Sequence, residues 1–172
     1  MNEKPVKSIL FVCLGNICRS PLAEGVFRAV LAERGVEAEF VVDSAGTGGW
    51  HAGSAPDPRS IAIAAQYGVD ITAQQARKVV PADFERFDLI LGMDRSNVDD
   101  LKASAPAKAA GRVELFLGHA TGRTRDVPDP YYGGDDGFAA VYRMIREASE
   151  ALADRLASRE SALRSGQASS TT

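Results

Sequence analysis

The fold is decided close to the N-terminus, where residues 8–21 read Ser8-Ile9-Leu10-Phe11-Val12-Cys13-Leu14-Gly15-Asn16-Ile17-Cys18-Arg19-Ser20-Pro21. The first six residues form a mostly apolar run, which is typical of a strand buried on both faces of a parallel sheet. A tight loop follows, and from Pro21 to Arg34 apolar residues recur at helical spacing until Gly35 stops the pattern. The stretch predicts a strand, a loop and a helix.

The same alternation continues along the chain. Further strands are predicted at residues 40–42, 88–93 and 113–117, and further helices at residues 57–68, from residue 96, and at residues 137–156. Asp57 and Pro58 supply an N-cap and a first-turn proline, and Asp94 can cap the helix after the third strand. The expected fold class is α/β with three layers, in which helices cover both faces of a four-stranded parallel sheet.

Length and composition limit the number of domains and the kinds of partner. A chain of 172 residues with 45% apolar residues is long enough for one buried core. We expect a single domain over residues 1–157 and a disordered tail over residues 158–172, which are rich in Ser, Thr and small residues. The formal net charge of -3 disfavours nucleic acid as a partner.

The sequence also predicts the cellular location of the protein and whether it needs a metal or a cofactor. No run approaches the roughly 20 apolar residues of a membrane span, and residues 1–7 lack the apolar core of a signal peptide, so we expect a cytoplasmic protein without membrane contact. Two cysteines and two histidines leave little material for a zinc site. No dinucleotide fingerprint or nucleotide P-loop is present. We therefore expect no metal and no cofactor.

The loop after the first strand carries the chemistry, because ligands of open parallel sheets bind beyond the carboxyl ends of the strands. The seven residues from Cys13 to Arg19 can curl so that successive backbone N–H groups point inward and hold a dianion above the following helix. Gly15 and Asn16 suit the positive φ angles that such a curl requires. Ser20 is placed as the N-cap of the helix.

Cys13 and Arg19 form the reactive pair of this loop. A cysteine that faces a helix N-terminus and a cation is expected to be a thiolate at neutral pH, and hence a nucleophile that needs no histidine. Arg19 offers a planar fork that binds two phosphoryl oxygens and follows the charge as the transition state forms. The loop amides and Arg19 supply the positive charge that a metal would otherwise provide.

A strand, the pattern Cys-x5-Arg-Ser/Thr and a helix together are the signature of cysteine-based phosphatases. Residues 12–21 closely resemble the low-molecular-weight protein tyrosine phosphatase family, and so do residues 43–47, 92–94 and 129–132, so that the resemblance spans about residues 7–156. It implies a flavodoxin-like fold of the phosphotyrosine phosphatase I type. It also implies hydrolysis of phosphotyrosine and small aryl phosphates through a cysteinyl-phosphate intermediate.

The resemblance implies a role for each matching position. Cys13 is the nucleophile, Arg19 the phosphate clamp and Asp129 the general acid and base. The positions expected around the phosphate are Leu14, Gly15, Asn16, Ile17, Cys18 and Arg19. Asn16, Ser20 and Ser44 are expected to support the loop from behind, although a turn asparagine and a helix-capping serine would explain two of them equally well.

The general acid has competitors nearby in the sequence, namely Asp126, Asp135 and Asp136. Asp129 lies between Pro128 and Pro130, which restrict the backbone on both sides of it. A fixed carboxyl group suits proton transfer to a leaving group better than a mobile one. We therefore expect Asp129 to be the acid.

Aromatic residues predict the shape of the substrate. Trp50, Tyr131 and Tyr132 lie on predicted loops at the carboxyl edge of the sheet and can wall a deep slot, with Leu14 and Ile17 completing the wall. The plainer interpretation of these aromatics is loop packing. A slot of this depth would admit the flat ring of phosphotyrosine on a protein and exclude phosphoserine, which would not reach Cys13.

Cys18 suggests a redox hypothesis, since it lies five residues after Cys13. If the two sulfurs approach each other, oxidation of Cys13 is captured as a reversible disulfide, which protects Cys13 from further oxidation. The alternative is that Cys18 is an ordinary buried apolar cysteine.

Two other functions share the same loop. Thiol-dependent arsenate reductases need further relay cysteines, and between Arg77 and Gly92 there are none. A catalytically inactive phosphotyrosine-binding module is disfavoured because Cys13, Arg19 and Asp129 are all present. We expect an enzyme that is a monomer or a weak dimer.

Overall fold

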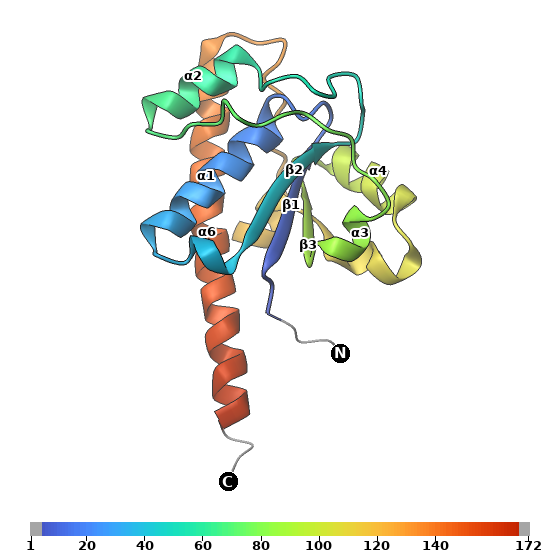
Figure 1. Cartoon of the computed structure of the whole chain (residues 1–172), viewed down its shortest axis with the longest axis vertical. Helices are drawn as coiled ribbons and strands as arrows, with labels where there is room; N and C mark the ends of the chain where they lie inside the picture. The colour runs from blue at the N-terminus through green and yellow to red at the C-terminus, as the bar shows by residue number, and fades with distance from the viewer. Residues whose placement is uncertain (1–4, 169–172) are drawn as a thin grey trace.

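The computed structural model describes residues 5–168, and its centre is a four-stranded sheet (Figure 1). The strands are β1 (Ser8–Cys13), β2 (Val41–Gly46), β3 (Leu89–Gly92) and β4 (Val113–Leu115). All neighbouring pairs are parallel, and the order across the sheet is β2-β1-β3-β4. The expected four-stranded parallel α/β fold is confirmed.

Helices cover both faces of the sheet (Figure 1). One face packs against α1 (Arg19–Glu33), α5 (Phe116–Thr121) and α6 (Asp135–Ala168), and α2 (Pro58–Gln66) packs against α1 and α6. The other face packs against α3 (Asp83–Arg86), α4 (Arg95–Ser104) and the short 3-10 helix η2 (Ala107–Arg112). A second 3-10 helix, η1 (Glu37–Glu39), precedes β2. The result is the three-layer arrangement expected from the sequence.

Strand β1 is buried on both faces, which fixes its register. Ile9 and Phe11 pack on the side of α1 and α6, while Leu10 and Val12 pack on the side of α3 and α4. The Phe11 ring meets the rings of Phe27 and Phe116 edge to face, with centroids 5.7 and 5.2 Å apart. A one-residue slip would move each of these side chains to the wrong face, so the position of Cys13 at the end of β1 is set by packing.

Several element boundaries differ from the prediction, and β2, for example, runs to Gly46 where residue 42 was expected to end it. Helix α1 begins at Arg19, and Cys18 already has helical backbone angles, so the expected N-cap at Ser20 is wrong. The phosphate loop runs directly into the helix, which leaves the Ser20 side chain free for other contacts. Strand β4 ends at Leu115 and residues 116–117 start α5, because this edge strand pairs only with β3 over three residues.

The tail prediction is corrected in part, since α6 continues to Ala168 and residues 158–168 are helical rather than disordered. Ion pairs stabilise this extension: Glu160 binds Lys7 at 3.1 Å and Arg164, one helical turn later, at 2.8 Å. The loss of apolar residues suggested disorder, whereas the pair between Glu160 and Lys7 forms only in the folded chain. The expected tail residues 169–172 lie outside the described residues.

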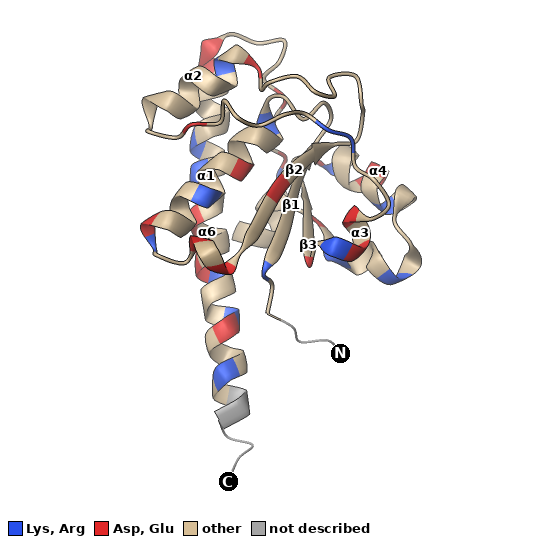
Figure 2. Ribbon diagram, viewed as in Figure 1, with Lys and Arg blue, Asp and Glu red and all other residues tan. Residues whose placement is uncertain are grey.

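Charges are distributed over the helices and avoid the sheet. Figure 2 shows acidic and basic residues interspersed along α1 and α6, while the four strands contain only two charged residues, Asp43 on β2 and Glu114 on β4. Within residues 5–168, no helix combines the length and the apolar character that crossing a membrane requires.

Candidate active site

The loop between β1 and α1 turns its carbonyl groups outward. Four of these carbonyls accept hydrogen bonds from groups outside the loop: Cys13 O from Thr47 N (2.9 Å), Leu14 O from Gly48 N (2.9 Å), Ile17 O from Asp57 N (2.7 Å) and Cys18 O from Ser60 Oγ (3.2 Å). With the carbonyls bound on the outside, the loop N–H groups are left to face inward. This is the geometry that binds a dianion.

Two positions allow this curl. Asn16 has φ 56°, as expected, whereas Gly15 does not have a positive φ. Gly46, at the end of β2, lies so close to the loop that a Cβ atom would stand 2.8 Å from Leu14 O and 3.1 Å from Asn16 N. Only glycine permits this contact, which holds the loop against the sheet.

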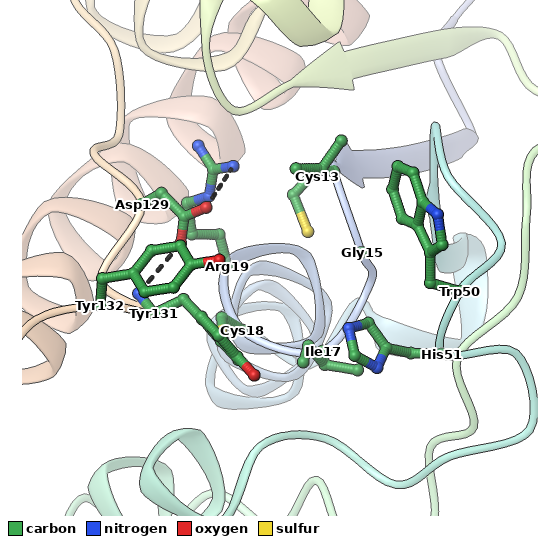
Figure 3. Close-up of a pocket in the computed structure, with 11 residues that line it drawn as sticks. Cys13, Gly15, Ile17, Cys18, Arg19, Trp50, His51, Asp129, Tyr131 and Tyr132 are labelled. Carbon is green, nitrogen blue, oxygen red and sulfur yellow. Dashed lines mark hydrogen bonds and ion pairs between the residues drawn. The ribbon is translucent and has the colours of Figure 1, made fainter.

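The sulfur of Cys13 is the centre of the loop. It accepts a hydrogen bond from the backbone N–H of Asn16 at 3.3 Å and lies 3.1 Å from Ser20 Oγ. When Cys13 is a thiolate, the Ser20 hydroxyl is the only donor of that second pair. The sulfur points into the open space of the pocket, between Trp50 on one side and Arg19 on the other (Figure 3).

Arg19 is held rigidly at the start of α1. Its side chain is only 2% exposed, and Nη1 donates to Asp94 Oδ2 at 2.7 Å and to the Val127 carbonyl at 3.0 Å. Nη2 lies 3.7 Å from Asp129 Oδ2 (Figure 3). Asp94 also caps α4 through its other oxygen, at 2.8 Å from Asn97 N. The guanidinium plane is therefore fixed by partners that leave Nη2 turned toward the pocket.

Asp129 is the only one of the four candidate aspartates that shares the pocket with Cys13. Its side chain is 42% exposed, and Oδ1 accepts a hydrogen bond from Tyr131 N at 3.0 Å. Asp126 pairs instead with Arg95 at 3.3 Å. Asp135 and Asp136 lie in the first turn of α6 and line a different hollow beside α2.

The pocket itself encloses about 260 Å³. Its lining includes the five residues predicted for the rim, Leu14, Ile17, Trp50, Tyr131 and Tyr132. Trp50 is 73% exposed and Tyr132 is 95% exposed, so their ring faces are available to a ligand. The lining also contains His51, which was not predicted from the sequence. His51 packs over Gly15, a contact that only the folded chain reveals.

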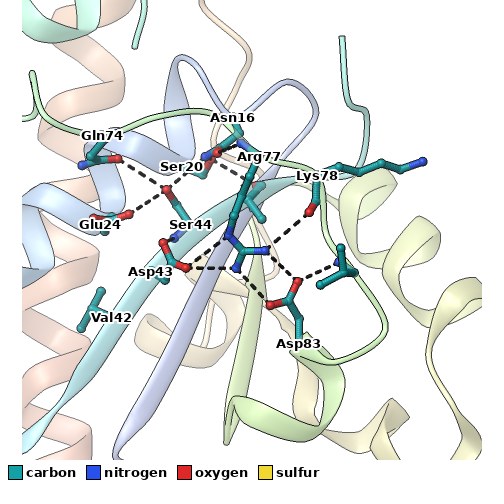
Figure 4. Close-up of polar contacts among 12 residues, drawn as sticks. Asn16, Ser20, Glu24, Val42, Asp43, Ser44, Gln74, Arg77, Lys78 and Asp83 are labelled. Atoms are coloured by element: carbon teal, nitrogen blue, oxygen red, sulfur yellow. Dashed lines mark hydrogen bonds and ion pairs between the residues drawn. The ribbon is translucent and has the colours of Figure 1, made fainter. Parts of the chain in front are cut away.

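Asn16, Ser20 and Ser44 lie behind the loop and form one hydrogen-bonded chain (Figure 4). The Asn16 amide nitrogen donates to Ser20 Oγ at 2.8 Å and to Ser44 Oγ at 3.0 Å, and its oxygen accepts from Arg77 N at 3.0 Å. Ser44 Oγ in turn donates to Glu24 Oε1 at 2.8 Å. Burial raises the pKa of the Glu24 carboxyl above its ordinary value. Glu24 was not predicted from the sequence, because it lies on α1 outside the motif.

Arg77 closes the network on the outer side (Figure 4). Its guanidinium group binds Asp43 on β2 at 3.0 Å and Asp83 on α3 at 3.0 Å. These pairs fix the segment around residue 77, whose backbone N–H holds the Asn16 side chain. No local pattern in the sequence points to Arg77, because its partners come from three separate elements.

Cys18 also lines the pocket but differs from Cys13 in its surroundings. Burial, followed by the negative charge of Asp57, raises the pKa of the Cys18 thiol to about 12. Cys18 is therefore a thiol at physiological pH. Both cysteines are free. Within residues 5–168, His, Cys, Asp and Glu side chains form no group of three or more that could hold a metal ion.

Comparison with known proteins identifies this arrangement. The family model described as low molecular weight phosphotyrosine protein phosphatase matches residues 8–162. The chain belongs to this family. A family member from Schizosaccharomyces pombe is 45% identical over 144 residues, which cover 83% of this chain and 92% of the relative.

Solved structures of the family share the fold over almost their whole length. A protein tyrosine phosphatase from Entamoeba histolytica, with Hepes in its active site, has a TM-score of 0.85 and 36% identity, covering 90% of this chain and 99% of its own. Vibrio vulnificus Wzb, in complex with benzylphosphonate, has a TM-score of 0.78 and 33% identity, covering 87% of this chain and 99% of its own. Cys13 and Arg19 occupy the positions that the family's phosphate loop requires.

Proposed function

We propose that this chain is a protein tyrosine phosphatase that hydrolyses phosphotyrosine and small aryl phosphates through a cysteinyl-phosphate, as one catalytic domain over residues 1–157. The observation that carries the proposal is the convergence of Cys13, Arg19 and Asp129 on one pocket at the carboxyl end of β1. Among the described residues, no aspartate other than Asp129 lines that pocket. The three groups supply a nucleophile, an anion clamp and a proton donor.

The phosphoryl group would lie in the loop of residues 13–19. The inward N–H groups and the N-terminus of α1 attract its oxygens, and Arg19 binds the two that lie toward Asp129. Because Asp94 and the Val127 carbonyl already hold Nη1, the guanidinium group needs little reorganisation when the negative charge shifts during the reaction.

In the first step the Cys13 thiolate attacks phosphorus. The S–P bond forms while the bond from phosphorus to the phenolic oxygen breaks, and that oxygen takes both bonding electrons together with the proton of Asp129. The products are a neutral phenol, ionised Asp129 and phosphorylated Cys13. Proton donation removes the need to expel a basic phenolate.

In the second step water attacks the phosphorylated Cys13. Asp129 takes a proton from the water, the S–P bond breaks, and the electron pair returns to sulfur. Inorganic phosphate is released, and both Cys13 and Asp129 regain their starting forms. The Ser20 hydroxyl, 3.1 Å from the sulfur, stabilises the departing thiolate.

An aromatic substrate fits the walls of the pocket. Trp50 lies opposite Tyr131 and Tyr132 (Figure 3), and Leu14 and Ile17 complete the apolar lining of the pocket. Benzylphosphonate, which Wzb binds, resembles the ring and phosphoryl group of phosphotyrosine, with a CH2 group in place of the ester oxygen. A phosphoserine side chain lacks the length to place its phosphorus against a sulfur at the pocket floor.

We further propose that Cys18 protects Cys13 from hydrogen peroxide. Peroxide converts the Cys13 thiolate to a sulfenic acid and releases hydroxide, and the Cys18 thiol then displaces water to form a disulfide. Both residues line the same pocket. Because the Cys18 pKa of about 12 leaves little thiolate, this second step should be slow at neutral pH. A sulfinic acid at Cys13 without a Cys13–Cys18 link, found by peptide mapping, would contradict it.

The cellular setting that fits this chemistry is the cytoplasm, whose reducing conditions keep Cys13 reduced and available as a nucleophile. We propose that the chain acts there as a monomer or a weak dimer on tyrosine-phosphorylated proteins, without a metal, a cofactor, nucleic acid or membrane contact.

The test is hydrolysis of p-nitrophenyl phosphate from pH 4 to 8 in the presence of EDTA. We expect turnover by the wild type, no turnover by Cys13→Ser, and a rate lowered about 100-fold or more in Asp129→Ala. Matched phosphotyrosyl and phosphoseryl peptides of one sequence should differ strongly in rate. If the reduced wild type is inactive, arsenate reduction with external thiols is the next assay, and failure there leaves a phosphotyrosine-binding module.

A further inference from the structure

The first turn of α2 touches both loops of the pocket. From Asp57, the backbone N–H donates to the Ile17 carbonyl of the phosphate loop at 2.7 Å. From Arg59, the side chain reaches the other way, to the backbone that follows Asp129. One short segment thus connects the phosphate loop with the loop that supplies the acid, residues 129–134, which we call the acid loop.

Arg59 makes its contacts with both edges of the guanidinium group. Nε and Nη2 donate to the two carboxylate oxygens of Asp57, each at 3.0 Å. Nη2 also donates to the Tyr131 carbonyl at 3.0 Å, and Nη1 donates to the Gly133 carbonyl at 3.2 Å. Two backbone carbonyls of the acid loop are therefore held by one planar group whose orientation Asp57 fixes.

Aromatic rings complete the site. The Arg59 guanidinium carbon lies 4.5 Å from the centre of the Phe138 ring and 5.6 Å from that of Tyr131. The Arg59 side chain is 34% exposed, so these contacts form in a partly desolvated position. The carboxyl of Asp57 is only 9% exposed, and the hydrogen bond from Arg59 holds its pKa below its ordinary value.

The contact with Tyr131 continues to the acid itself. Tyr131 is held from both sides of its Cα atom: its backbone carbonyl accepts from Arg59, and its backbone N–H donates to Asp129 Oδ1 at 3.0 Å. That bond leaves Asp129 Oδ2, the oxygen 3.7 Å from Arg19 Nη2, free to carry the proton toward the pocket. A shift of residue 131 would therefore rotate the carboxyl group of Asp129.

We propose that Arg59, oriented by Asp57, is a positioning residue that fixes the acid loop relative to the phosphate loop and so aims Asp129 at the leaving-group oxygen. The inference rests on the proposed phosphatase function. Arg59 touches no reacting atom, and it acts through the backbone of Tyr131 and Gly133. The plainer alternative is that Arg59 only stabilises the start of α2.

The two roles differ in how they depend on the leaving group. If Arg59 aims the acid, its removal matters for substrates whose phenol must be protonated, such as phosphotyrosine and phenyl phosphate. It matters little for 2,4-dinitrophenyl phosphate, whose phenolate leaves unprotonated. A loss of folded protein lowers the rates for all substrates equally. The ratio kcat/KM is the measure, because it reports the steps up to cleavage of the P–O bond.

The experiment compares Arg59→Gln, Arg59→Lys, Asp129→Asn and the double variant Arg59→Gln/Asp129→Asn. We expect Arg59→Gln to lower kcat/KM for phenyl phosphate about 10-fold or more, and for 2,4-dinitrophenyl phosphate less than about 2-fold. Arg59→Lys keeps the charge but loses the planar fork, so its kcat/KM for phenyl phosphate should lie between those of the wild type and Arg59→Gln. In the Asp129→Asn background, Arg59→Gln should have no further effect on phenyl phosphate.

Arg34→Gln is the matched control. Arg34 also binds one carboxylate, Asp154, and one carbonyl, that of Glu150, but it does so between α1 and α6, away from both loops. Its substitution should leave both substrates unaffected. Equal losses for both substrates in Arg59→Gln, or full additivity with Asp129→Asn, would overturn the proposal.

Hydrogen exchange separates this proposal from the proposed function. In Arg59→Gln, peptides that cover residues 129–134 should exchange faster than in the wild type, while those that cover residues 13–20 should be unchanged. This result does not depend on turnover, so it tests the contact between Arg59 and the acid loop even if the wild type proves inactive. Unchanged exchange in residues 129–134 would also overturn the proposal.

Discussion

Arg19 Nη1 donates to Asp94 Oδ2 across 2.7 Å, which places the key cation of the phosphate loop against a carboxylate from the end of β3. Asp94 thus has two roles, because its other oxygen caps α4 through the N–H of Asn97. A hydrogen bond between charged groups in a desolvated position contributes about 1.5–3 kcal/mol. The orientation of Arg19 should therefore depend on Asp94.

The first prediction concerns this pair. Asp94→Asn keeps an N-cap for α4 but removes the charge that holds Arg19, so kcat/KM for aryl phosphates should fall about 10- to 100-fold. Inhibition by inorganic phosphate should weaken in parallel, and the melting temperature should change little. An unchanged inhibition constant for phosphate would show that the backbone carbonyl of Val127 holds Arg19 sufficiently without Asp94.

The second prediction concerns Ser20. Asn16 Nδ2 donates to Ser20 Oγ, so the Ser20 hydrogen can point at Cys13 Sγ, at 3.1 Å, in preference to the Ala45 carbonyl at 3.4 Å. Ser20→Ala should slow breakdown of the cysteinyl-phosphate, lowering kcat about 10-fold or more while kcat/KM changes less. Rapid mixing with p-nitrophenyl phosphate should then reveal a burst of p-nitrophenol.

A suitable control for Ser20→Ala is Ser149→Ala. Ser149 is also buried, but its hydroxyl, on α6, has no hydrogen-bond partner among the described residues. The substitution Ser149→Ala should leave both kcat and kcat/KM unchanged. If Ser20→Ala lowers kcat and kcat/KM equally and shows no burst, the hydroxyl acts in the first step instead.

The third prediction separates the two cysteines by alkylation. Iodoacetate at pH 7.5 should modify Cys13, whose sulfur faces an anion-binding loop, and spare Cys18, whose thiol has a pKa of about 12. Inorganic phosphate should protect Cys13, and labelling should be lost in Cys13→Ser. Mass spectrometry of the peptides gives the readout, and prompt labelling of Cys18 would mean that its burial is not maintained in solution.

The fourth prediction concerns the buried carboxyl of Glu24, whose pKa is raised by burial. A group with a raised folded-state pKa stabilises the fold below its unfolded-state pKa, and that stability is lost as the pH rises through the folded-state pKa. Glu24→Gln keeps an oxygen that accepts from Ser44 and removes this loss. At pH 7.5 its melting temperature should equal the wild type or exceed it by about 2–4 °C.

The sign of the Glu24 effect is checked by repeating the melting curves at pH 4, where the advantage of Glu24→Gln should disappear. Glu33→Gln, an exposed glutamate of the same helix, serves as the control and should show no such dependence. A variant that is less stable than the wild type at pH 7.5 would mean that the ion pair between Glu24 and Arg28 outweighs the cost of burial.

The sequence by itself determined the fold class and the centre of the site, because both depend on local patterns. The apolar run of β1 needs burial on two faces, and the loop from Cys13 to Arg19 follows it directly, so the chain order alone places a nucleophile and a cation at the carboxyl edge of the sheet. The caps at Asp57 and Asp94 were predictable for the same reason, since each bonds to a residue two or three positions later.

Only the tertiary structure decided what surrounds and orients that centre. Four contacts join residues that are far apart in the chain. They are those of Asp94 with Arg19, Glu24 with Ser44, Arg77 with Asn16, and Arg59 with the backbone that follows Asp129. Composition also did not predict that residues 158–168 continue α6. Ion pairs of Glu160 with Lys7 and with Arg164 stabilise this part of the helix. The contacts between residues far apart in the chain depend on distances of a few ångströms that packing of the sheet and helices sets, and no local spacing in the sequence encodes them.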